Sequence, residues 1–172
     1  MTRLYVDATV LISLGKIGEL THLTTFDGPI VVLPTIQSEV TTQPAAANLE
    51  TVCEQECVMT TPPVTPADDR AMEILGESAV NGDVRLIGAV LEETAAAESV
   101  AVISDDRRVR TVADGLGAQV TGTIGVLVRA VEAGVQPAAA HELLRQLDAN
   151  GLHMTAALRS RAEKLINDAA PE

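Results

Sequence analysis

Short runs of apolar and β-branched residues alternate along this chain with segments of helical spacing, and this alternation constrains the fold more than any other feature. The run PIVVLP at 29–34, for example, predicts a buried strand, and DVRLIGAVLEETAAAE at 83–98 predicts a helix with an apolar stripe. Such repeated strand–helix units predict an α/β fold with a mostly parallel sheet and helices on both faces. The strands are expected at 3–7, in 29–34, at the start of 58–66, in 99–104 and at 118–122. Pro34 and Thr35 separate the second strand from the next helix, and Thr35 is the expected cap of the helix that starts TIQSEV.

Length and hydropathy set the outer limits of the protein. Its 172 residues suit one domain, and no segment is long enough to be read as a linker between two. No apolar run reaches the roughly 18 residues of a membrane span, and no basic segment precedes an apolar one as in a secretion signal. We therefore expect a single cytoplasmic domain over 1–172 with no membrane partner.

The charge balance is strongly acidic, with 24 Asp and Glu against 12 Lys and Arg and a net charge of −12. Tyr5 and Phe26 are the only aromatic residues, which excludes an RNA-binding sheet that stacks bases on exposed rings. The acidity has two explanations: a protein that repels anions, or a halophilic protein whose surface carboxylates stay solvated in high salt. The presence of only two lysines favours the second.

The two cysteines, Cys53 and Cys57, lie four residues apart in CEQEC, a spacing that would put them on one face of a helix. A zinc site needs further soft ligands, and the three histidines are scattered along the chain. We interpret both cysteines as ordinary small core residues.

Carboxylates follow several of the predicted strands, and the first of them interrupts the apolar run LYVDATVLI. In open parallel sheets the reactive crevice lies beyond the carboxyl ends of the strands. Several carboxylates gathered there would raise one another's pKa values, and a hard divalent cation removes that conflict. Mg²⁺ or Mn²⁺ suits such oxygen ligands, and the alternative for each residue is a structural one, as a helix cap or in a solvated turn. The candidates are Asp7, Glu39, Asp83, Asp105 and Asp106.

Four segments in this order resemble the PIN-domain nucleases. They are LYVDATVLI, LPTIQSEV, NGDVRLIGAVLEE and VISDDRRVRTVADGLGAQVTGTIGVLVRAVEAGV, and the Asp-Asp-Arg-Arg and Gly-Thr-x-Gly-x-Leu portions are similar to a VapC-like subfamily. The resemblance covers most of residues 3–150, and the tail at about 154–169 is similar to that subfamily's final helix. It implies a three-layer α/β/α sandwich with a short parallel sheet and a metal-dependent ribonuclease site.

The resemblance also implies roles for individual residues. Asp7 matches the first acid of the family motif, Glu39 the second, and Thr9 the hydroxyl that follows Asp7. Asp83 stands where the family usually has Glu after Gly, and Asp105, with Asp106 beside it, matches the last acid. The expected metal ligands are Asp7, Glu39, Asp83, Asp105 and Asp106, and the first four are the expected catalytic residues.

Several roles stay open at this level. Which of Asp105 and Asp106 faces the site is undecided, and Asp106 is also suited to cap the helix that begins RRVR. Thr9 is either a hydrogen-bond donor to Asp7 or a plain β-branched strand residue. The basic cluster Arg107, Arg108 and Arg110 either contacts substrate phosphate or pairs with nearby acids, and Thr123 either begins a helix or receives a phosphate.

The leading hypothesis is a Mg²⁺- or Mn²⁺-dependent endoribonuclease that acts as, or derives from, the toxin of a VapBC-type toxin–antitoxin pair. Its partners would be an RNA substrate, a small antitoxin protein and a second copy of itself. The alternative is a catalytically impaired PIN-like protein that binds an antitoxin or RNA, suggested by the shorter acid at 83. Haloacid-dehalogenase-like and response-regulator folds are disfavoured, because this chain has Thr9 where the former has a second Asp, and both need a well-placed lysine.

Overall fold

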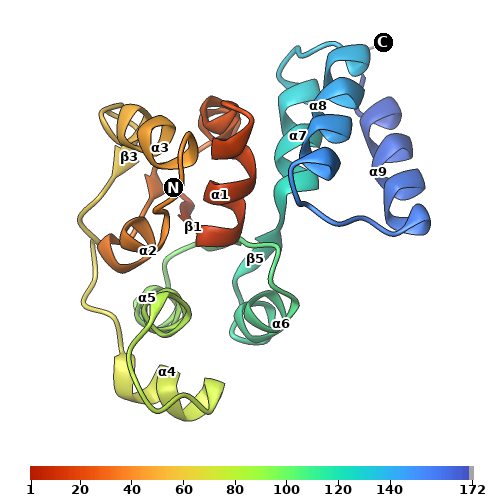
Figure 1. Ribbon diagram of the computed structural model, residues 1–172. Helices are drawn as coiled ribbons and strands as arrows, with labels where there is room; N and C mark the ends of the chain where they lie inside the picture. Colours follow the sequence, from red (N-terminus) through yellow and green to blue (C-terminus); the bar gives the residue numbers. More distant parts are fainter. Residues whose placement is uncertain (171–172) are drawn as a thin grey trace.

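The computed structural model of the protein describes residues 1–170, and residues 171–172 of the expected domain lie outside the described part. Five strands alternate with helices along the chain (Figure 1). The strands are β1 (Arg3–Val6), β2 (Ile30–Val31), β3 (Val58–Met59), β4 (Val100–Ile103) and β5 (Gln119–Thr121). The helices are α1 (Ala8–Lys16), the 3₁₀ helix η1 (Leu20–Thr25), α2 (Pro34–Glu39), α3 (Ala45–Cys53), α4 (Asp68–Leu75), α5 (Gly82–Ala95), α6 (Arg107–Gly115), α7 (Thr123–Glu132), α8 (Pro137–Ala149) and α9 (Ala156–Asp168).

All strand pairs are parallel, in the order β3-β2-β1-β4-β5. The sheet is flanked by helices, which confirms the predicted α/β/α sandwich. In Figure 1, α1 lies on one side of the sheet and α5 and α6 lie on the other. Because β1 and β4 are neighbours although about a hundred residues separate them, the chain that follows β1 and the chain that follows β4 emerge side by side. The same edge of the sheet receives the chain leaving β2.

The core consists mainly of small and medium aliphatic side chains from both faces of the sheet. Strand residues such as Val6, Val102 and Ile103 are fully buried, as are Leu11 of α1 and Ile87 of α5. Parallel strands covered on both faces need such continuous apolar runs, which explains the β-branched character of the predicted strands.

Glu93 of α5 is a charged residue within this core. It is completely buried, accepts a hydrogen bond from the Tyr5 hydroxyl (2.7 Å) and forms an ion pair with Arg3 (2.5 Å); both partners belong to β1. Since a buried carboxylate must be paired to be tolerated, this contact links the position of α5 to that of β1.

Two local predictions are wrong. Thr35 is predicted to cap the second helix, but that helix begins at Pro34, with Leu33 in the cap position. Proline suits the first helical position because its fixed φ is already helical and its missing N–H is not needed there. The cysteine prediction also fails in part, since α3 ends at Cys53, which is half-buried, and Cys57 lies beyond it and is exposed.

The last three helices, α7, α8 and α9, pack against one another and lie beyond the β5 side of the sheet (Figure 1). The final helix predicted at about 154–169 is present as α9. Within the described residues, no helix has the length and apolar character that crossing a membrane requires.

Candidate active site

Asp7 lies at the junction between β1 and α1, at the carboxyl edge of the sheet. It occupies the cap position of α1, but its side chain makes no capping hydrogen bond to that helix. The residue is only 3% exposed, and its Oδ2 accepts hydrogen bonds from Ser104 Oγ (2.6 Å) and Thr9 Oγ1 (2.8 Å). The two hydroxyls hold this buried carboxylate in place without any cationic partner among the described residues.

Glu39 is the last residue of α2, and its carboxylate reaches the first residue of α5. Its Oε1 accepts a hydrogen bond from the Gly82 backbone N–H at 2.9 Å. A Cβ at position 82 would lie 2.5 Å from that oxygen, so glycine is what allows this approach. Burial of the carboxyl raises the pKa of Glu39, the Gly82 hydrogen bond lowers it, and the charges of Asp7 and Asp83 raise it further.

Asp83 lies in the first turn of α5, whose cap is Asn81. Burial raises the pKa of Asp83, and the charges of Asp7 and Asp106 raise it further, while Arg108 acts in the opposite direction. The Arg108 Nη2 lies 3.4 Å from Asp83 Oδ2. The charges of Asp7 and Asp83 thus raise the pKa of Glu39, and the charges of Asp7 and Asp106 raise the pKa of Asp83.

Asp105 and Asp106 are neighbours in sequence but point to different elements. Both oxygens of Asp105 are occupied by Thr123, whose N–H and hydroxyl donate at 2.8 and 2.6 Å, so this side chain holds the start of α7. Asp106 caps α6 through Oδ1, which accepts from the backbone N–H groups of Arg108 and Val109. Asp106 therefore caps α6, as one of its two predicted roles requires, and its charge also raises the pKa of Asp83.

A pair of hydroxyls connects these acids. Thr9 lies in α1 and not in a strand, which corrects the strand alternative, and besides its bond to Asp7 it accepts the Asp105 backbone N–H at 3.1 Å. Ser104, fully buried at the end of β4, donates to Asp7 and accepts the Asp106 backbone N–H at 3.0 Å. Ser104 is not among the residues predicted from the sequence, although its hydroxyl directly before Asp-Asp was the available signal.

The arginines of the basic cluster have different surroundings. Arg108 is paired with Glu77 (2.6 Å) and Asp83, as expected if these arginines neutralise nearby acids. Arg107 is exposed at the start of α6. Thr123 begins α7, and its N–H is taken by Asp105, so that N–H is not available to a phosphate in this structure.

A profile of the PIN-domain family matches residues 4–168. The match covers nearly the whole chain and includes every acid described above. The chain belongs to the PIN-domain family. A search of curated protein sequences found no match.

PIN domains are generally nucleases that hydrolyse phosphodiester bonds, and they typically use divalent metals. The donors at this edge of the sheet suit Mg²⁺ or Mn²⁺ in kind, since they are carboxylates without imidazole or thiolate. The charge they accumulate also favours a cation, because their repulsion and burial raise the pKa values of Glu39 and Asp83. Among residues 1–170, however, no three Asp, Glu, His or Cys side chains are gathered tightly enough to hold a metal ion.

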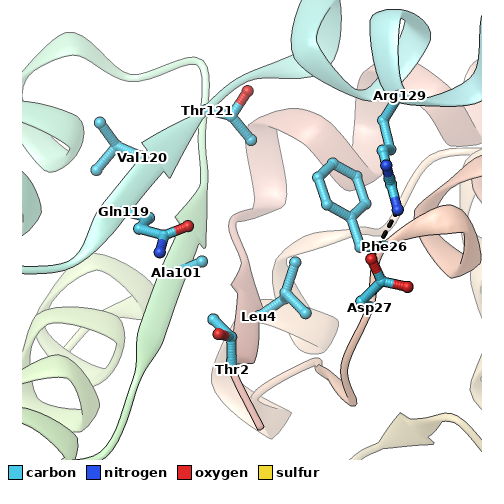
Figure 2. A pocket seen from close by; sticks show the side chains of 9 residues that line it. All are labelled: Thr2, Leu4, Phe26, Asp27, Ala101, Gln119, Val120, Thr121 and Arg129. Atoms are coloured by element: carbon cyan, nitrogen blue, oxygen red, sulfur yellow. Dashed lines mark hydrogen bonds and ion pairs between the residues drawn. The ribbon is translucent and has the colours of Figure 1, made fainter. Parts of the chain in front are cut away.

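This PIN domain also has a hollow of about 320 Å³ that none of the candidate acids lines. Figure 2 shows Phe26, Asp27 and Arg129 on one side and Gln119 and Val120 on the other. The guanidinium of Arg129 is already engaged by Asp27 (2.8 Å), by the carbonyl of Thr25 (3.0 Å) and by Glu132 (3.2 Å). The candidate acids therefore lie at the sheet edge and not in this hollow.

Proposed function

We propose that this PIN-domain protein is a Mg²⁺- or Mn²⁺-dependent endoribonuclease that acts as, or derives from, the toxin of a VapBC-type toxin–antitoxin pair. The observation that supports it most is that Asp7, Glu39, Asp83 and Asp106 lie at the carboxyl edge of a parallel sheet, where the charges of Asp7 and Asp83 raise the pKa of Glu39 and those of Asp7 and Asp106 raise the pKa of Asp83. A protein that uses no cation here would gain nothing from that repulsion.

The proposed ligands are Asp7, Glu39, Asp83 and Asp106. Asp105 was an expected ligand, but its two oxygens already bind Thr123, which favours Asp106 in its place and a supporting role for Asp105. A bound divalent ion would supply an activated water and offset the charge of the phosphodiester during hydrolysis. Ser104 and Thr9 would orient Asp7 by hydrogen bonds to one oxygen, leaving the other for the ion.

The basic residues supply the contact to RNA in this proposal. Arg107, exposed at the start of α6 two residues after Asp105, is suited to a phosphate beside the acids. A small antitoxin protein and a second copy of the chain are the further partners that the likeness to VapC-like proteins suggests.

The test is the substitution Asp7→Asn, which keeps the size of the side chain and removes its charge. We expect it to reduce Mn²⁺-dependent cleavage of a mixed-sequence RNA by at least about a hundredfold, because a neutral amide is a poor ligand for a hard cation. Asp69→Asn, an exposed residue in the first turn of α4, removes the same charge away from the site and should leave cleavage unchanged. Thermal unfolding of both variants checks that the fold persists, and cleavage retained by Asp7→Asn would overturn the assignment.

The alternative is a PIN domain that binds partners without efficient cleavage. Two observations favour it: Asp83 is one methylene shorter than the Glu usual in the similar family segment, and Arg108 already pairs with it. Calorimetric titration with Mn²⁺ separates the two functions. If the protein binds Mn²⁺ and Asp7→Asn abolishes that binding, the nuclease is supported. If the protein does not bind Mn²⁺ and does not cleave RNA, the alternative is supported.

A further inference from the structure

Arg108 connects three parts of the molecule at the edge of the proposed active site. It is the second residue of α6, and its guanidinium reaches Glu77 Oε1 at 2.6 Å, Asp83 Oδ2 at 3.4 Å and the Leu75 carbonyl oxygen at 3.4 Å. Leu75 is the last residue of α4 and Glu77 lies just beyond it, whereas Asp83 lies in the first turn of α5. The guanidinium is therefore shared between one acid of the site and one acid outside it.

This sharing distinguishes Asp83 from the other three acids. Within residues 1–170, Asp83 is the only member of the group Asp7, Glu39, Asp83 and Asp106 that forms an ion pair. The carboxyls of Asp7 and Asp106 act against the charge of Asp83, and Arg108 acts in its favour. Arg108 thus supplies at Asp83 part of the positive charge that the cluster lacks.

A guanidinium and a divalent cation compete for the same carboxylate. Both are attracted to Asp83, and they repel each other at the few ångströms that separate ligands around one ion. The shorter contact of Arg108 is with Glu77, and Glu77 has a half-buried side chain that can retain the guanidinium after Asp83 is released. Arg107, the preceding residue, has the same charge and is exposed like Arg108, but it forms no ion pair among the described residues.

We propose that Arg108 is the resident counter-cation of Asp83, that a divalent ion displaces it toward Glu77, and that this pair sets the metal affinity of the site. The inference rests on the proposed metal-dependent function and adds a positioning residue to it. Arg108 acts through Asp83, not on the reacting atoms.

The experiment measures the Kd of Mn²⁺ by calorimetry at one pH and ionic strength, without RNA. Arg108→Gln removes the competitor and should lower the Kd roughly threefold to tenfold relative to Arg107→Gln, the range expected for one partly exposed charge pair. Arg107→Gln has the same net charge and controls for the general attraction of a more acidic protein. Arg108→Lys restores a cation and should return the Kd toward the wild-type value.

Glu77→Gln tests the same inference from the other side, and keeps it testable if Arg108→Gln does not fold. Without Glu77, Asp83 is the remaining carboxylate partner of Arg108, so the Kd of Mn²⁺ should rise about twofold to fivefold relative to Glu73→Gln, a matched change on the exposed side of α4.

The outcomes separate this inference from the proposed function. Equal Kd values for Arg108→Gln and Arg107→Gln, or weaker binding by Arg108→Gln, would overturn the role of Arg108 while leaving metal dependence intact. Binding that appears only in Arg108→Gln supports the competition. Absence of Mn²⁺ binding in the wild type and in Arg108→Gln alike would overturn both.

Discussion

At the scale of single residues, the absence of one Cβ determines where Glu39 can lie. Gly82 has no positive φ that would demand glycine, so its backbone conformation alone leaves other residues possible. The requirement comes from across the site, because the Glu39 carboxylate lies against its Cα and accepts its N–H. In the sequence, Asn81-Gly82 indicates a turn. In the structure, the glycine also leaves room for the Glu39 carboxylate.

Gly82→Ala should therefore displace Glu39, because the added methyl would lie 2.5 Å from Oε1. We expect the Kd of Mn²⁺ to rise by about tenfold or more, with a change in the free energy of unfolding of at most about 1 kcal/mol, since alanine otherwise favours a helix start over glycine. Calorimetry and thermal unfolding measure the two effects. Gly115→Ala is the control, because no atom lies within 4 Å of its added methyl, and it should leave the Kd unchanged.

At the scale of elements, the three residues Ser104, Asp105 and Asp106 join the end of β4 to three different parts of the fold. Ser104 binds the acid that follows β1, Asp105 binds the first residue of α7, and Asp106 caps α6. A sequence pattern predicts that acids follow a strand, but it does not say which neighbour each side chain meets. Here three adjacent side chains point in different directions, so that one contacts Asp7, one contacts Thr123 and one caps α6.

Asp105→Ala should loosen the start of α7 more than it affects the metal site. Loss of two short hydrogen bonds from Thr123 is expected to cost about 1–2 kcal/mol in the free energy of unfolding, the typical cost of losing a charged cap. Chemical denaturation measures it, with Asp114→Ala, an exposed acid of α6, as the control. The Kd of Mn²⁺ should rise far less than in Asp7→Asn, and an equal loss would show that Asp105 is a ligand after all.

At the scale of the whole molecule, the net charge of −12 is the dominant feature. Like charges spread over a small domain oppose the compact state, and added salt shortens the range of that repulsion from about 10 Å at 0.1 M to about 3 Å at 1 M. If the composition is halophilic, added salt should therefore stabilise the fold by weakening this self-repulsion.

Raising KCl from 0.1 to 1 M at pH 7 should therefore increase the unfolding midpoint by roughly 3–8 °C, which corresponds to about 1–2 kcal/mol for a chain of this size. Scanning calorimetry at both salt concentrations measures it. At pH 4.6, near the isoelectric point, the net charge nearly vanishes and the same salt should have a much smaller effect. An equal increase at both pH values would instead point to a general salt effect on apolar surface.

Some features of the fold follow from the sequence pattern, and others depend on tertiary contacts. The periodicity of the chain predicted the five strands, the parallel sheet and the helices on both faces, because buried parallel strands and amphipathic helices need those apolar repeats locally. It could not determine the start of the second helix, where Leu33 and Pro34 displace the expected Thr35 cap, or the exposure of Cys57 beyond the end of α3. Helix ends depend on one or two residues and on tertiary neighbours, whereas repeats are spread over whole segments.

By itself, then, the sequence determined the α/β architecture and placed acids at the ends of strands, since backbone periodicity and residue type are local properties. Only the tertiary structure decided which acids act together. It turned Asp105 toward Thr123, brought Asp106 near Asp83, set Glu39 against Gly82 and paired Arg108 with both Glu77 and Asp83. These contacts join residues 18 to 43 positions apart in the sequence, and side-chain direction at such junctions depends on neighbours that no local pattern contains.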